Sequence, residues 1–346
     1  MKACVLGAGS WGTALANVLA TNGHDVVIWG RDEAVVNAIN KDHLNPRYLP
    51  GGALSPLLHA TTDFAGAIRD AELVLFSVPS QALPVLVSDA SALISQTAVI
   101  VHAVKGFTRP NNVRISEHIN LVMPNVEKRL AVLSGPSHAE EVVRGMPTTV
   151  VIASASQSTA ETVQDAFMNA QFRVYTQADV VGVELGGTLK NIIALGVGLT
   201  DGLGLGDNTK AALMTRGLAE ITRLGVSLGA SPLTFSGLAG IGDLIVTCTS
   251  NHSRNFRTGR LLATGLALNE ALEQIGMAVE GVSTTFAAAE LAQTHQVDMP
   301  ITTALKCVLK GDVTPGAAVR ELMQRERSHE MEDVGQRPLT HHWRFS

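Results

Sequence analysis

The sequence has few of the residues that cross-link small folds or bind metal ions. Only 3 of the 346 residues are cysteines, Cys4, Cys248 and Cys307, and they are far apart in the chain. An odd number of scattered thiols is typical of a reducing compartment, and their spacing matches neither a disulfide framework nor a zinc site. We therefore expect free thiols and no bound metal.

Charge and long apolar runs are also scarce. Charged residues make up 16% of the chain, the formal net charge is −5, and no Lys/Arg block alternates with aromatic residues. This composition gives no electrostatic basis for non-specific nucleic-acid binding. Only a few apolar residues precede the glycine turn, so we expect no signal peptide, and no apolar run approaches the ~20 residues that span a bilayer. We expect a soluble, cytoplasmic protein without nucleic-acid or membrane partners.

What the chain does contain is 46% hydrophobic residues, arranged in the first half as short apolar runs separated by helical stretches. Strands covered by helices on both faces are continuously apolar, and their alternation with helices is typical of a mainly parallel sheet. Residues 1–179 are therefore predicted to form a doubly wound, Rossmann-like α/β domain. The runs are residues 26–29, 73–78, 98–104, 130–133 and 149–153.

The second half shows a different pattern, because the strand signal disappears after about Val181. Helical periodicity with many small residues predicts an all-α domain over residues 180–325. The polar residues 175–179 mark the boundary, and the polar residues 326–346, which lack periodicity, are expected to form a mobile tail. The helical segments are predicted at residues 185–199, 211–224, 261–275 and 284–291.

The most informative motif is a G-x-G-x-x-G that follows an apolar run and precedes a helical one. In it, Gly7 allows a tight turn, Gly9 lets the backbone approach a diphosphate, and Gly12 lets the helix pack closely on the strand. The positive end of the following helix attracts anions. This context predicts a dinucleotide-binding site.

The identity of the dinucleotide depends on the end of the second strand, where Arg31 precedes Asp32. A carboxylate at this place accepts a hydrogen bond from a ribose 2′-hydroxyl, whereas an arginine pairs with a 2′-phosphate. We expect NADP to be accepted as well as NAD. The alternative is that Arg31 and Asp32 are a solvated surface pair at the start of a helix and do not contact a dinucleotide.

Lys190 is the strongest candidate for acid–base chemistry. It lies in an apolar helical segment and has no carboxylate four residues before or after it. Burial would lower its pKa, and a lysine that titrates near neutrality can exchange a proton with a substrate hydroxyl. The alternative is a lysine that extends to solvent. The neighbouring Asn191 either orients a substrate hydroxyl or caps a bend.

Three other segments carry candidate ligand-binding residues. Lys105 ends a predicted strand and is expected at the carboxyl edge of the sheet, facing the cleft, although a solvated lysine is the alternative. Ser137, as N-cap, and Glu140, three residues later, form a predicted capping box. Arg254, between Ser253 and Asn255, is expected to clamp an organic phosphate, although an ordinary surface arginine is the alternative.

The order of these motifs resembles that of one family. The segments GAGSWGTALA, NPRYLPG, SVPSQAL, AVKG, LSGPSHAEE, ELGGTLKNIIAL, AGIGDLIVTC, SRN and AVEGV occur in this order. From Met1 to about Leu322 the chain resembles the bacterial NAD(P)-dependent glycerol-3-phosphate dehydrogenases. The resemblance implies interconversion of sn-glycerol 3-phosphate and dihydroxyacetone phosphate with NADP or NAD, as a supply for phospholipid synthesis.

The resemblance also implies residue roles, with Lys190 as the proton donor and acceptor. Contacts with the dinucleotide are implied for the glycine turn and for Ser10, Trp11, Arg31, Tyr48, Lys105, Ala139, Arg254 and Glu280. Contacts with glycerol phosphate are implied for Lys105, Gly135, Ser137, Lys190, Asn191, Asp243, Thr247, Ser253, Arg254 and Asn255.

Two other functions are compatible with the same domain order. One is a dehydrogenase for a β-hydroxyacid or sugar acid, which would not need Arg254 as a phosphate clamp. The other is a nucleotide-sensing regulator without turnover, in which Lys190 and Asn191 would only pack. For the assembly, small-residue helices in the second half suggest a homodimer through that half.

Overall fold

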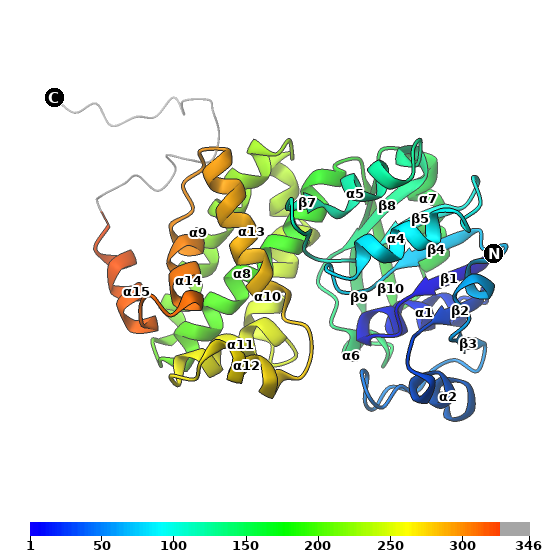
Figure 1. Cartoon of the computed structure of the whole chain (residues 1–346), viewed down its shortest axis with the longest axis horizontal. Helices are drawn as coiled ribbons and strands as arrows, with labels where there is room; N and C mark the ends of the chain where they lie inside the picture. The colour runs from blue at the N-terminus through cyan, green and yellow to red at the C-terminus, as the bar shows by residue number, and fades with distance from the viewer. Residues whose placement is uncertain (326–346) are drawn as a thin grey trace.

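Residues 1–325 are described by the computed structural model, and they form two unlike regions that lie side by side (Figure 1). A sheet with helices on both faces occupies the N-terminal region, and helices alone make up the C-terminal region. The predicted fold class, a Rossmann-like domain followed by an all-α domain, is confirmed. The predicted mobile tail, residues 326–346, lies outside the described residues.

The main sheet has eight strands in the order β10-β9-β8-β5-β4-β1-β2-β3. All neighbouring pairs are parallel except β8 and β9, so the expectation of a mainly parallel sheet is confirmed. The structure adds β3 and β10, which the sequence reading did not predict. The strands are β1 (Lys2–Leu6), β2 (Asp25–Trp29), β3 (Leu58–Thr61), β4 (Leu73–Phe76), β5 (Val99–His102), β8 (Leu130–Ser134), β9 (Thr148–Ser154) and β10 (Phe172–Gln177).

Both faces of this sheet are buried, which explains the continuously apolar runs. In β1, Ala3 and Val5 face one core, whereas Cys4 and Leu6 face the other. Successive side chains of a strand point to opposite faces, so a strand covered on both sides has to be apolar throughout. The first core is closed by α1 (Ser10–Thr21), α2 (Glu33–Asp42), α6 (Ala139–Val142) and α7 (Gln157–Phe167), and the second by α3 (Phe64–Ile68), α4 (Leu83–Ser91) and α5 (Ile115–Val122).

The strand order reverses between β1 and β4. Chain connections leave these neighbouring strands in opposite directions, and the carboxyl ends of the strands border a crevice there. The turns that follow β1, β4 and β5 therefore meet at one edge of the sheet. A small hairpin of β6 (Phe107–Thr108) and β7 (Val113–Arg114) continues from β5 toward the helical region, and the 3₁₀ turn Glu127–Arg129 precedes β8.

The helical region is built around α8 (Val180–Gly202), whose side chains are almost all buried. Helices before and after it in the chain enclose it, so it has no exposed face that would need polar residues. The remaining helices are α9 (Gly206–Ser227), α10 (Asp243–Thr249), α11 (Arg254–Ala263), α12 (Leu268–Ile275), α13 (Glu280–Thr294), α14 (Pro300–Lys310) and α15 (Pro315–Met323), with a 3₁₀ turn at Pro232–Ser236 and a π-helical turn at Leu238–Gly242.

One helical prediction was wrong. The expected segment 261–275 is divided between α11 and α12. The chain breaks at Gly265, which has φ +91° and therefore cannot continue a right-handed helix.

Within the described residues, α8 alone has the length and hydropathy of a membrane-spanning helix, and 89% of its most apolar window is buried inside the protein. This burial is what the central helix of a folded domain requires.

The two regions are joined by a buried carboxylate near the start of α8. Glu184, which is 3% exposed, accepts hydrogen bonds from the backbone N–H and the hydroxyl of Ser116, at 2.9 and 2.6 Å. Arg114 Nη1 donates to the same carboxylate at 2.9 Å. Because Arg114 and Ser116 belong to the sheet region, this cluster fixes α8 against it.

Candidate active site

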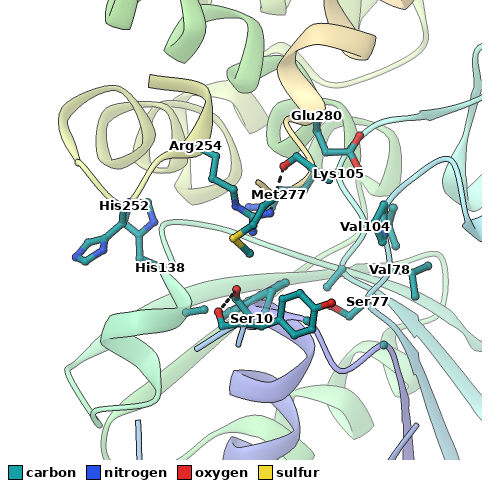
Figure 2. Close-up of a pocket in the computed structure, with 18 of the residues that line it drawn as sticks. Ser10, Ser77, Val78, Val104, Lys105, His138, His252, Arg254, Met277 and Glu280 are labelled. Carbon is teal, nitrogen blue, oxygen red and sulfur yellow. Dashed lines mark hydrogen bonds between the residues drawn. The ribbon is translucent and has the colours of Figure 1, made fainter. Parts of the chain in front are cut away.

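A cavity of about 670 Å³ lies where the carboxyl edge of the sheet meets the helical region. Figure 2 shows Ser10, Ser77 and Val78 on its sheet side, with Arg254 and Met277 extending toward them from the helical side. Of the residues for which the resemblance implies a contact with the dinucleotide or with glycerol phosphate, Gly12 and Gly135 alone do not line the cavity. The others line it: Gly7, Gly9, Ser10, Trp11, Arg31, Tyr48, Lys105, Ser137, Ala139, Lys190, Asn191, Asp243, Thr247, Ser253, Arg254, Asn255 and Glu280.

The turn after β1 has the shape that a dinucleotide requires. Gly7 has φ +124°, and a Cβ there would lie 2.4 Å from the carbonyl oxygen of Ser77. A Cβ at Gly12 would lie 1.9 Å from the carbonyl oxygen of Gly7, so α1 packs closely on the turn. By contrast, no atom of the part of the chain that the structure describes lies within 4 Å of a Cβ at Gly9, which borders the cavity. No side chain among residues 1–325 caps the first N–H groups of α1, and these groups remain available to an anion.

Lys190 is buried at the helical wall of the cavity, with 5% of its surface exposed. Its ammonium donates hydrogen bonds to Oδ1 of Asp243 and, at 2.7 Å, to Oγ1 of Thr247. The pKa of Lys190 is lowered to about 7, chiefly by burial and in smaller part by the nearby Lys105, and the Asp243 carboxylate opposes both effects. The predicted burial of Lys190 is confirmed, and the alternative of a lysine that extends to solvent is wrong.

Asp243 connects two lysines from different regions of the chain. It is the first residue of α10, follows the π-helical turn, and is 1% exposed. Its Oδ2 accepts a hydrogen bond from Lys105 Nζ at 2.9 Å. Burial alone would raise the pKa of Asp243, but the ammonium groups of Lys105 and Lys190 lower it below its usual value. The carboxylate is therefore ionised, and it holds both cations beside the cavity.

Arg254 begins α11 rather than lying in a surface loop. Ser253 is the N-cap, and its hydroxyl accepts a hydrogen bond from Phe256 N. The guanidinium of Arg254 donates from Nη1 to the carbonyl of Ala278 at 3.2 Å and extends into the cavity (Figure 2). Burial lowers its pKa, but an arginine remains charged at neutral pH. The cavity thus contains a fixed cation opposite the glycine turn.

Asn191 and Asn255 form a buried bridge between helices. Nδ2 of Asn255 donates to Oδ1 of Asn191, and Oδ1 of Asn255 accepts from Gly281 N, both at 2.9 Å. These bonds tie α8, α11 and α13 together directly behind Lys190 and Arg254. The alternative in which Asn191 caps a bend is wrong, because α8 continues through it to Gly202.

The predicted capping box is also wrong. The helix α6 begins at Ala139, its N-cap is His138, and no side chain caps it. The hydroxyl of Ser137 instead donates to the carbonyl of Gly135 at 2.9 Å. Because His138 occupies the cap position, Glu140 stands at the second helical residue and cannot close the box.

Two interactions between residues of the cavity were not predicted from the sequence. Glu280 accepts hydrogen bonds from the backbone N–H of Ser80, at 3.0 Å, and from its hydroxyl, at 2.8 Å, which joins α13 to the turn after β4. Burial raises the pKa of Glu280, and the two bonds from Ser80 oppose that rise. At the opposite end, Arg47 pairs with Asp32 at the cavity rim. The motif NPRYLPG was the signal for Arg47, but a single arginine in a loop has no periodicity to mark it.

Comparison with known proteins identifies the family of this site. Residues 2–160 match the model of the NAD-dependent glycerol-3-phosphate dehydrogenase N-terminus. Residues 179–320 match that of the C-terminus of the same family. Among the described residues, no group of three or more histidines, cysteines and carboxylates is placed so that it could hold a metal ion.

Similar proteins extend over nearly the whole chain. A glycerol-3-phosphate dehydrogenase [NAD(P)+] of Bacillus licheniformis is 53% identical over 96% of this chain and 97% of its own. That of Halalkalibacterium halodurans is 54% identical over 95% and 96%. A crystal structure of glycerol-3-phosphate dehydrogenase from Coxiella burnetii has a TM-score of 0.89 and 39% identity, and covers 94% of this chain and 99% of that one.

More distant structures share the fold alone. A ketopantoate reductase from Ralstonia eutropha is 14% identical, with a TM-score of 0.55 over 92% of this chain and all of its own. The two matching domain models and the relatives at about half identity decide the assignment. The chain belongs to the NAD-dependent glycerol-3-phosphate dehydrogenase family.

Proposed function

We propose that this chain is a dehydrogenase that interconverts sn-glycerol 3-phosphate and dihydroxyacetone phosphate with NAD(P). The observation that carries the proposal is that Lys190 is buried at a cavity that Arg254 also lines, and that its pKa is lowered to about 7. Lys190 can exchange a proton, and Arg254 can bind a phosphate. The named relatives, which act with NAD(P)+, support the same reaction.

The dinucleotide would be held on the sheet side of the cavity. Its diphosphate fits the open backbone at Gly9 and the uncapped start of α1 at Ser10, and Trp11, Ala139 and Glu280 line the same space. When bound, the nicotinamide supplies or accepts hydride at C2 of the substrate. Arg31 and Tyr48 are proposed contacts of the adenosine end.

Lys190 would move the proton that accompanies this reaction. As an ammonium it can donate to the ketone oxygen of dihydroxyacetone phosphate, and as an amine it can accept the hydroxyl proton of glycerol 3-phosphate. Thr247 and Asp243 orient its Nζ by direct hydrogen bonds. Lys105 adds positive charge next to the oxygen that becomes an alkoxide.

Arg254 would bind the phosphate of the substrate. Only one of its N–H groups is directed to Ala278, and the planar guanidinium can present the others to phosphate oxygens. Ser253 and Asn255 flank it, and Gly135 and Ser137 are proposed to complete the site from the sheet side. Fixing both ends of a three-carbon substrate keeps C2 in reacting geometry.

The test is the absorbance of NADPH and of NADH after addition of dihydroxyacetone phosphate. We expect rapid oxidation of the reduced cofactor by the wild type. For Lys190→Ala we expect kcat to fall by about 10³-fold or more, while the unfolding transition stays cooperative. The matched control is Lys310→Ala, which removes an exposed lysine far from the cavity on α14. Near wild-type turnover by Lys190→Ala would exclude Lys190 as the proton donor, and preference for a phosphate-free hydroxyacid would overturn the substrate.

The cellular setting follows from the same reaction. We infer that the enzyme supplies glycerol 3-phosphate for phospholipid synthesis, and that it works in the cytoplasm, which its three free cysteines favour.

A homodimer through the helical region is proposed, and light scattering at two protein concentrations tests it. A mass of 36.4 kDa at both concentrations would exclude the dimer.

A further inference from the structure

The adenosine end of the cavity carries an ion pair that the reaction itself does not need. Arg47 Nη1 donates to Oδ2 of Asp32, and both residues line the rim with Arg31 and Tyr48. The guanidinium carbon of Arg47 also lies 5.2 Å from the centre of the Tyr48 ring. The side chain of Arg47 is 62% exposed, so its remaining N–H groups face the open rim.

Asp32 occupies the place at the tip of β2 where a carboxylate selects NAD. A free carboxylate there would accept a hydrogen bond from the ribose 2′-hydroxyl and would repel a 2′-phosphate. Both oxygens of Asp32 are already engaged. Its Oδ1 accepts from Ala34 N at 2.9 Å, as the N-cap of α2, and its Oδ2 binds Arg47. The hydrogen bond from Ala34 N, together with Arg47, lowers the pKa of Asp32, so its charge is present and is neutralised by Arg47.

The loop that carries Arg47 is fixed to the glycine turn. Asn45 is fully buried, and its Nδ2 donates to the carbonyl of Ala8 at 3.0 Å and to Oγ1 of Thr13 at 2.8 Å. The hydroxyl of Ser10 donates to the carbonyl of Tyr48 at 2.5 Å. Arg47 therefore has a defined position relative to the turn that would hold the diphosphate.

We propose that Arg47 determines acceptance of the 2′-phosphate of NADP by masking the charge of Asp32 and by offering its guanidinium, beside Arg31, to the phosphate. The inference rests on the proposed function only in requiring that a dinucleotide binds in this cavity. Arg31, Arg47 and Asp32 together carry a formal charge of +1, which favours a phosphate at the rim. Without Arg47, the formal charges of Arg31 and Asp32 would cancel, and the carboxylate of Asp32 would be exposed at the rim.

The experiment measures binding without substrate. Isothermal titration calorimetry of the full chain with NADPH, NADH, adenosine 2′,5′-bisphosphate and 5′-AMP compares the wild type with Arg47→Gln and Asp32→Asn. In Arg47→Gln we expect NADPH and the bisphosphate to bind at least about tenfold more weakly, the effect of one lost charge-assisted hydrogen bond. NADH and 5′-AMP should change by less than about threefold. Asp32→Asn keeps the helix cap and should tighten NADPH.

The matched control is Arg173→Gln. Arg173 lies on β10, outside the cavity lining, and stacks on Tyr175 at 5.3 Å as Arg47 does on Tyr48. It should leave the affinity of all four ligands unchanged. Equal weakening of NADPH and NADH in Arg47→Gln, or no weakening of either, would overturn the inference.

The proposed function can fail separately. If the wild type binds NADPH but does not reduce dihydroxyacetone phosphate, the proposed function is wrong, and a selective loss of NADPH binding in Arg47→Gln still supports the inference. If the wild type binds neither dinucleotide, both proposals are overturned.

Discussion

The ammonium of Lys105 lies 2.9 Å from Oδ2 of Asp243, a carboxylate that is almost completely buried. Removing the cationic partner of a buried carboxylate is costly, because the remaining charge is left without compensation. With Lys105 present, Asp243 keeps a counter-ion when Lys190 loses its proton. The pair thus explains how Lys190 can alternate between ammonium and amine beside an ionised carboxylate.

The first prediction concerns pH. Because the pKa of Lys190 is lowered to about 7, the amine needed to oxidise glycerol 3-phosphate is populated above that pH and the ammonium needed for reduction below it. The kcat/KM of oxidation should rise with pH through about 7, and that of reduction should fall over the same range. Initial rates in both directions between about pH 5 and pH 9 check this. Parallel profiles for the two directions would contradict it.

The second prediction is that Asp243→Asn moves the oxidation profile to lower pH. The charge of Asp243 favours the ammonium form of Lys190. An amide of the same shape removes that charge, whereas the positive charge of Lys105 remains and still disfavours the ammonium form. The midpoint should fall by about one unit or more. The control is Asp207→Asn, which alters a carboxylate on an exposed side chain of α9. An unchanged midpoint in Asp243→Asn would show that Asp243 does not set the pKa.

Local patterns predicted much of the fold and the position of Lys190. The glycine turn is defined by contiguous residues, and the absence of a carboxylate near Lys190 on its helix already indicated burial. The pairing with Asp243 could not be predicted, because 53 residues separate the partners and only the packing of α10 on α8 brings them together. The same reason applies to Glu280 and Ser80, which are 200 residues apart.

The errors arose where the local sequence is compatible with more than one backbone structure. Ser137 has the sequence of an N-cap, but its hydroxyl reaches the carbonyl of Gly135 instead, and His138 takes the cap position. The break at Gly265 was hidden because apolar residues with helical spacing lie on both sides of it. Propensity does not distinguish a glycine inside a helix from one that ends it, whereas the tertiary packing of α11 and α12 does.

The third prediction concerns the phosphate clamp. Arg254→Ala should raise the KM for dihydroxyacetone phosphate by about 30-fold or more, since a charge-assisted contact of about 2 kcal/mol is lost. Arg257→Ala, one turn along α11 at an exposed position outside the cavity lining, should leave KM unchanged. Steady-state kinetics at saturating NADPH measures both. An unaltered KM in Arg254→Ala would exclude the clamp.

The fourth prediction tests whether Glu184 fixes α8 in place. Glu184→Gln leaves Arg114 without its buried counter-ion and places an amide N–H₂ against donors, so the free energy of unfolding should fall by about 2 kcal/mol. Urea unfolding followed by circular dichroism measures the change.

The matched control for this prediction is Glu290→Gln, at a carboxylate that is 53% exposed and also contacts an arginine, Arg109, at 3.7 Å. Because surface ion pairs contribute little, this variant should lie within about 0.5 kcal/mol of the wild type. Glu184 precedes Lys190 on α8 by less than two turns, so loosening its anchor should also reduce kcat while the unfolding transition stays cooperative. Equal stability of the two variants would mean that apolar packing alone holds α8 against the sheet region.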